Sequence, residues 1–261
     1  MEPPSPPPPS GPPPSPPYSS APPPYSSPPP PYSSAPPRPP AQSAAERVRA
    51  AYQGRNQTDY IFEYWSALGW SVLSCGIYGF YVIYQLVRRM RDHNRRRLDL
   101  LEGAIAFAWE KVQADPDLAD ELRPYFERMA GNLRVLQQMT TEFRDPTVWT
   151  VLSVVVGGII NIVVFILLDG DLVRHAWSER AVEHDLAFVY GRLGKQLPAP
   201  VRPTKEKHNY VARVIVACVT LGIYMFWWYY NVMVEPNAHF VEDWAWEDRL
   251  GAAVYELSTA G

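Results

Sequence analysis

Three apolar runs, each followed by a polar stretch, dominate the pattern of hydrophobic and polar positions along the chain. They cover residues 67–87, 148–168 and 211–234. A bilayer core of about 30 Å needs roughly 20 apolar residues in a helix, so each run has the length of a membrane span. We therefore predict an all-α membrane protein with three hydrophobic helices, located as a multi-pass protein in the cell membrane.

The polar stretches after the runs carry apolar residues at helical spacing. Leu98, Leu101, Ile105 and Val112 form one such stripe, and Asp115 followed by Pro116 has the pattern of a helix cap with proline in the first turn. Each hydrophobic helix is thus expected to lead into an amphipathic helix. The predicted divisions are a tail and lead-in at 1–58, repeat units at 59–112, 148–197 and 198–261, and an intervening amphipathic helix at 113–147.

The three runs are copies of one pattern. In each, a glycine is followed seventeen positions later by a histidine just past the run, and a glutamate follows that histidine after eight or nine positions. Self-similarity at fixed spacing indicates a reused structural unit. The motif residues are Gly76, Ile77 and Tyr78, then Gly158 and Ile159, then Gly222, Ile223 and Tyr224; the histidines are His93, His175 and His239; the glutamates are Glu102, Glu183 and Glu247.

The N-terminal tail has a composition that cannot pack a core. Residues 1–40 hold 22 of the 29 prolines, with Tyr18, Tyr25 and Tyr32 in a seven-residue near-repeat. Such a stretch favours a solvated, disordered polyproline ensemble. It is interpreted as a spacer, with a ligand for a proline-recognition partner as the alternative, because Pro-Pro-x-Tyr occurs at Tyr25 and Tyr32.

The strings SCGIYGFYVIYQLV from Ser74 and VTLGIYMFWWYYNV from Val219 resemble the hallmark of an uncharacterised bacterial membrane family, domain of unknown function 4234. Asn237 and His239 also fit its pattern, whereas Ile160 replaces the tyrosine in the middle unit. The resemblance implies a helical inner-membrane protein of bacteria. It implies no activity.

Topology decides how the three histidines are interpreted. The arginines between Arg88 and Arg97 place the first inter-run loop in the cytoplasm, and three alternating spans then put His175 across the bilayer from His93 and His239. A three-histidine zinc site would need all three on one side, for example if runs bend back at their glycines. We favour three spans, histidines that mark run boundaries, and a solvated face for His175, Glu179 and Glu183.

The sequence carries no signature of a reaction. It lacks a glycine-rich phosphate loop, a nucleophile elbow and paired carboxylates within a run, and a net charge of -3 gives no reason to expect nucleic acid. We predict no catalytic, cofactor or metal site and a structural or regulatory membrane component, not an enzyme. The alternative is a small transporter or channel subunit acting as an oligomer. The expected partners are the lipid bilayer, a second copy of the chain and a protein bound by the tail.

Overall fold

The computed structural model describes residues 42–198 and 208–259, and within these ranges every regular element is a helix. The proline-rich tail lies outside the described residues, so its disorder and its partner stay predictions. The helices are α1 (Ala44–Gln53), α2 (Arg55–Thr58), α3 (Tyr64–Leu73), α4 (Ile77–Val112), α5 (Pro116–Thr141), α6 (Pro146–Val156), α7 (Gly158–Arg192), α8 (Tyr210–Val219) and α9 (Ile223–Thr259).

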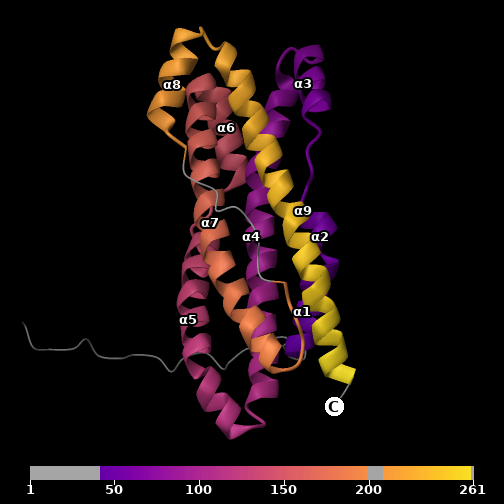
Figure 1. Ribbon diagram of the computed structural model, residues 1–261. Helices are drawn as coiled ribbons and strands as arrows, with labels where there is room; N and C mark the ends of the chain where they lie inside the picture. The colour runs from indigo at the N-terminus through magenta and orange to yellow at the C-terminus, as the bar shows by residue number, and fades with distance from the viewer. Residues whose placement is uncertain (1–41, 199–207, 260–261) are drawn as a thin grey trace, which may run out of the picture. The chain divides into compact units, whose positions relative to one another are not determined.

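Three long helices, α4, α7 and α9, pack against one another and carry the rest of the fold. Each follows a short apolar helix: α3 precedes α4, α6 precedes α7, and α8 precedes α9. Figure 1 shows these three short helices gathered at one end, whereas α1 lies beside the other half of α4. α5 packs between α4 and α7, and Asp115 and Pro116 begin it as the sequence predicts.

The chain turns between short and long helix in the same way in the first and third units. The N–H groups of Gly76 and Gly222 bond to carbonyls five residues earlier, at 2.7 and 2.8 Å. Both glycines have a φ near 90°, in the left-handed region that favours glycine. The hydroxyls of Ser74 and Thr220, two residues before each glycine, accept the N–H of the motif tyrosines at 2.9 and 3.1 Å. The repeat motif is therefore a helix-turn-helix connection.

The middle unit turns differently. Its break falls at Gly157, with φ 81° and ψ -152°, and motif residue Gly158 is already the first residue of α7. That combination of angles is sterically open almost only to glycine. In the second unit, seventeen positions still separate the motif glycine, Gly158, from His175. The turn itself lies one residue before that glycine, at Gly157.

The prediction of membrane-spanning helices is wrong, and with it the membrane fold class and the multi-pass location. Among the residues described, none of the helices combines enough length with enough apolar character to cross a bilayer. Each apolar run is divided by its glycine turn, so its first seven to nine residues belong to a ten- or eleven-residue short helix. The rest of the run begins a long helix that soon becomes polar, as α4 does at Arg88.

Two apolar clusters fill the interior along the long helices. One lies toward the short helices and includes Val82, Phe165 and Trp228. The other includes Leu101 and Leu186 and extends to α1 and α5. Along α4 and α7 the histidines lie between the residues of one cluster and those of the other. On α9, Phe240 of the first cluster follows His239, and Asp243 lies between Phe240 and Trp246 of the second cluster, so a polar layer separates two apolar cores.

A buried arginine compensates for a hydrogen bond that is missing within α9. Pro236 lies inside that helix, and because proline has no N–H, the carbonyl of Val232 four residues earlier loses its usual donor. The Arg89 guanidinium donates to the carbonyls of Val232 and Met233 at 3.0 Å each and to Asn237 Oδ1 at 2.7 Å. All these acceptors are neutral, and burial lowers the pKa of Arg89 to about 9.

We expect Gly157→Ala to lower the free energy of unfolding by about 1–3 kcal/mol, because alanine is strained at those backbone angles. Gly158→Ala is the matched control. A Cβ there meets nothing within 4 Å, and alanine in a helical backbone should be neutral or stabilise by about 0.4–1 kcal/mol. Urea denaturation followed by circular dichroism measures both; equal effects would contradict the assigned turn.

Arg89→Met should destabilise the fold by about 1–3 kcal/mol for each buried carbonyl that loses its donor. In a Pro236→Ala background the loss should be smaller, since the introduced alanine supplies an N–H to the carbonyl of Val232. A double-mutant cycle measures this coupling. Arg88→Met, whose side chain is 45% exposed, is the control and should change stability by at most about 1 kcal/mol. Additive effects of the two substitutions would contradict this compensation.

Candidate metal centre

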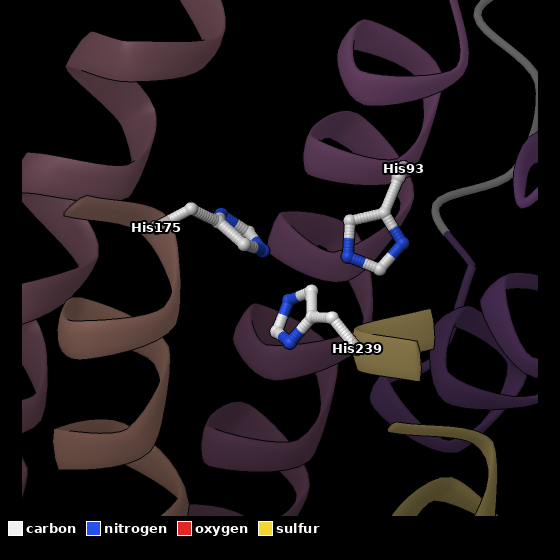
Figure 2. A group of neighbouring side chains, drawn as sticks. All are labelled: His93, His175 and His239. Carbon is white, nitrogen blue, oxygen red and sulfur yellow. The ribbon is translucent and has the colours of Figure 1, made fainter. Parts of the chain in front are cut away.

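The three repeat histidines meet in the interior. His93 on α4, His175 on α7 and His239 on α9 are 0%, 1% and 8% exposed. Their ring centroids are 5.2 to 5.8 Å apart, and one nitrogen from each lies within 4.8 Å of the others. Figure 2 shows the three rings converging from separate helices. Alternating spans would have separated His175 from the other two. That expectation is wrong, because a turn divides each apolar run and the three histidines lie together in the fold.

Two carboxylates complete this cluster one helical turn further along. Glu179 and Asp243 follow their histidines by four residues and are fully buried. Glu179 Oε2 lies 3.5 Å from Nε2 of both His175 and His239. Asp243 Oδ2 lies 3.4 Å from Nε2 of both His93 and His239. These four distances exceed the usual range for a hydrogen bond from nitrogen to oxygen.

The same distances suit ligands of one ion. Two ligand atoms that each lie about 2.1 Å from a tetrahedral zinc are about 3.4 Å apart. His93, Glu179 and Asp243 also form a group whose ligand atoms lie within 4.8 Å of one another. Three imidazoles and two carboxylates, without a thiolate, match the preference of divalent first-row ions such as Zn²⁺, Fe²⁺ or Mn²⁺ rather than of Cu⁺.

Arg97 occupies the position in the first unit that Glu179 and Asp243 occupy in the others, four residues after the histidine. It is completely buried and bonds to Glu179, to Glu183 at 2.5 Å and to Glu247 at 2.8 Å. Burial by itself lowers the pKa of Arg97, but the surrounding carboxylates raise it well above its ordinary value. The guanidinium stays charged and ties α4 to α7 and α9.

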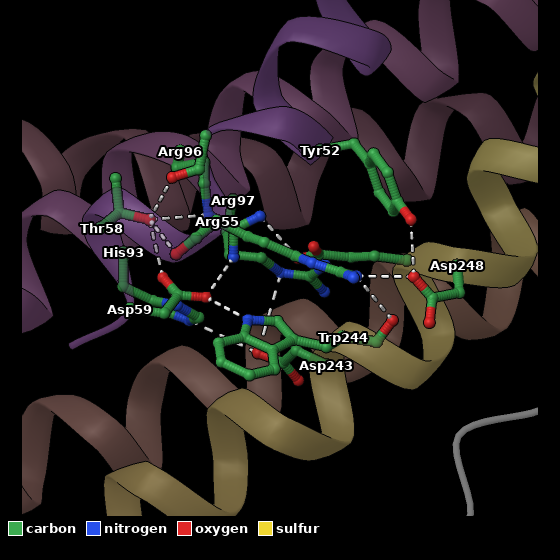
Figure 3. A network of polar contacts seen from close by, with 12 residues as sticks. Tyr52, Arg55, Thr58, Asp59, His93, Arg96, Arg97, Asp243, Trp244 and Asp248 are labelled. Atoms are coloured by element: carbon green, nitrogen blue, oxygen red, sulfur yellow. Dashed lines mark hydrogen bonds and ion pairs between the residues drawn. The ribbon is translucent and has the colours of Figure 1, made fainter. Parts of the chain in front are cut away.

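Asp59, just after α2, orients the first histidine (Figure 3). Its Oδ1 lies 3.0 Å from His93 Nδ1, while Oδ2 accepts from Arg96 at 2.6 Å and from the Trp244 indole at 2.8 Å. Burial raises the pKa of the Asp59 carboxyl, but His93 and Arg96 outweigh that effect and hold the pKa well below its usual value. A carboxylate behind a histidine that leaves Nε2 facing the cluster is the usual outer support of a metal-bound imidazole.

The network contains several buried carboxylates. Five are at most 2% exposed, and within the described residues they contact the guanidinium groups of Arg96 and Arg97. Burial of negative charge is costly unless a cation or protons offset it. The carboxylates are Asp59, Glu179, Glu183, Asp243 and Glu247.

Sequence reasoning found the histidines and named Glu179 and Glu183 beside His175, but it did not place Asp243, Arg97 or Asp59 at this cluster. The face of His175, Glu179 and Glu183 is buried, not solvated. Glu102, grouped with Glu183 and Glu247 by the repeat, instead pairs with Arg47 at 2.9 Å away from the network. The four-residue spacing that joins His175 and Glu179 would also have identified Asp243 and Arg97 when applied to the other two histidines. No comparable signal marks Asp59, which precedes the first apolar run and has no counterpart in the repeated motif.

The motif residues lie elsewhere. Gly76, Ile77 and Tyr78, with Gly158, Ile159, Gly222, Ile223 and Tyr224, stand at the turns into the long helices, not at the histidine cluster. They are therefore architectural residues that set where each long helix begins. Seventeen positions of helix then carry each histidine to the same level.

Comparison with known proteins adds nothing to this geometry: no protein family, no curated protein and no solved structure matches the chain. The resemblance of the Gly-Ile-Tyr strings to domain of unknown function 4234 stays a prediction.

Arg97→Met should destabilise the protein by about 3–5 kcal/mol, because it removes a buried guanidinium that bonds three buried carboxylates. The control is Arg123→Met on α5, whose side chain is 56% exposed and pairs with Asp120; its effect should be at most about 1 kcal/mol. Urea denaturation compares the two variants. A difference below about 1 kcal/mol would contradict the structural role given to Arg97.

Proposed function

We propose that this protein is a non-enzymatic helical scaffold whose three repeat units are joined by a buried divalent transition-metal ion. His93, His175 and His239 would supply imidazole nitrogens, and Glu179 and Asp243 would supply carboxylate oxygens. The observation that carries the proposal is the set of four nitrogen-to-oxygen distances of 3.4 to 3.5 Å between these groups. They are too long for good hydrogen bonds and suitable for ligands of one ion.

A structural role is favoured over a catalytic one by the burial of the ligands. The side chains of Glu179 and Asp243 are fully buried, and the most exposed of the histidines is His239 at 8%. Catalytic metal sites keep a position open to substrate, whereas structural sites are closed by protein ligands. Because the ligands come from three long helices, an ion would stabilise their association directly.

The support for the ligands is also consistent with this role. Arg97 bonds one oxygen of Glu179, Oε1, and the other oxygen, Oε2, faces His175 and His239. Asp59 similarly leaves Nε2 of His93 turned toward Asp243. Each of these two ligands is thus oriented by a partner on its far side, as in established metal sites.

The purified protein, loaded with Zn²⁺, Mn²⁺, Fe²⁺, Co²⁺ or Ni²⁺ and dialysed, should retain about one ion per chain by elemental analysis. Removal of the ion by a chelator should lower the melting temperature, because a ligand bound only by the folded state stabilises it. His175→Gln should reduce metal retention strongly.

His184→Gln is the matched control, since His184 lies on the same helix with its side chain 73% exposed; it should retain metal as the unchanged protein does. If none of the five ions is retained and the chelator leaves the melting temperature unchanged, the proposal is wrong.

A further inference from the structure

The three short helices and the beginnings of the long helices form an end of the fold that carries almost no charge. Residues 64–87, 146–168 and 210–234 contain one charged side chain, Arg213. They lie at the end where Figure 1 shows α3, α6 and α8 gathered, and we call this part the apolar end. A cavity of about 840 Å³ lies between its helices, with Gly76, Gly157 and Gly222 in its lining, and it too has no charged side chain around it.

Large apolar side chains at the apolar end are exposed on every short helix. Trp70 on α3, Val151 on α6 and Ile215 on α8 are 54–58% exposed. Exposure is greatest next to the turns, where Leu221 reaches 93% and five further side chains reach 72–77%. Extended apolar surface of this kind marks an interaction site. The five side chains are those of Leu73, Ile77, Val155, Val219 and Ile223.

The polar groups at the turns bond within the protein. The N–H groups of residues 74–76 donate to carbonyls of α3, those of residues 220–222 donate to carbonyls of α8, and the N–H of Gly157 donates to the carbonyl of Ser153. The hydroxyls of Ser71, Ser153 and Thr220 also donate to helix carbonyls, at 2.7–2.9 Å. In hydrocarbon, backbone polar groups must find their partners inside the protein. The N–H groups of these turns meet that requirement.

The depth of the apolar end matches one leaflet of a lipid bilayer. The short helices have ten or eleven residues, which is about 15 Å of helix, and half of a bilayer core of about 30 Å has the same depth. Aromatic rings lie at the starts of these helices, where tryptophan and tyrosine favour the level of the lipid head groups. Arg213 is the fourth residue of α8, so its long side chain can reach that level. The aromatic residues are Trp65, Trp149 and Tyr210.

We propose that the apolar end inserts into one leaflet of a lipid bilayer, from one side and without crossing it. This contact differs from the spanning helices predicted from the sequence, because the chain turns back within the leaflet. Lipid is favoured over a second copy of the chain, since a protein surface would cover one side of this end, whereas α3 and α8 expose apolar side chains on two sides of it (Figure 1). The insertion is independent of the proposed metal centre.

Flotation with vesicles of dioleoylphosphatidylcholine tests the insertion. The full chain should float with the vesicles at about 0.1 M and about 1 M salt alike, because salt screens charges but not apolar burial. Leu221→Asp should weaken binding by about a hundredfold, since a carboxylate is costly in hydrocarbon. Aspartate also tolerates the φ of 50° at this position better than leucine does. Val155→Asp on α6 should have the same effect.

Val241→Asp is the matched control. Val241 is 52% exposed on α9, beyond His239 and outside the apolar end, so the variant should bind as the unchanged protein does. Melting temperatures show that all three variants fold. Equal binding by Leu221→Asp, Val155→Asp and Val241→Asp would overturn the proposal, and so would loss of binding at high salt.

The two native cysteines report the depth of insertion. Cys75 lies in the first turn and Cys218 next to the third, and both are free and exposed. A charged maleimide that does not enter lipid should label both in the protein alone, and phosphatidylcholine vesicles should protect both. Protection without lipid would assign this surface to a second copy of the chain. That result would overturn the proposal, as would full labelling on vesicles.

Thiols introduced by His184→Cys and Ser258→Cys test whether the chain stays on one side. His184 is 73% exposed on α7, and Ser258 is exposed near the end of α9. Both thiols should remain reactive toward the charged maleimide when the protein is bound to sealed vesicles. Shielding of either thiol would show that a unit crosses the bilayer and would overturn insertion from one side.

Discussion

The buried arginine Arg97 is the interaction on which the arrangement of the long helices depends. It lies between two apolar cores and bonds to acidic side chains from both neighbouring long helices. Apolar packing alone would tolerate a shift of one helix along another, because leucine and valine make similar contacts at several registers. A shift of one turn would carry Glu179 or Glu247 away from its cation and toward an apolar core, which is costly. The charge layer therefore fixes the register.

The first unit differs from the other two by having Arg97 where they have Glu179 and Asp243, and this difference stabilises the charge layer. Had all three units carried a carboxylate four residues after the histidine, three acids would converge at that level without the guanidinium of Arg97. Arg97 replaces the first acid and bonds the second, Glu179. Asp59, which precedes the first apolar run, supplies the first unit with a carboxylate that contacts His93 instead. The three units thus share one backbone arrangement, but the charge of the residue four positions after the histidine differs between the first unit and the other two.

Sequence reasoning predicted the helices and the common spacing between glycine and histidine in the three units. It did not predict that the chain turns at or directly before those glycines. Hydropathy averaged over about 20 residues counts the residues on both sides of Gly76 as one segment, although a left-handed turn there ends one helix and starts another. The same error affected the predicted site, because alternating spans separated His175 from His93 and His239 and so excluded a three-histidine metal site. Asp59 was beyond prediction, since its contact with His93 joins segments with no shared pattern.

The seventeen-residue spacing sets the levels of both the glycine turns and the histidine cluster. Seventeen residues of helix cover about 25 Å, so turns placed at one level of three packed helices bring their histidines to another common level. At the first level glycine is needed for the backbone, and the missing side chains leave the cavity lined by Gly76, Gly157 and Gly222. At the second level the helices are in close contact, and the histidines fill the space between them. The same spacing therefore places the open glycine turns at one end of the bundle and the close-packed histidines at its polar centre.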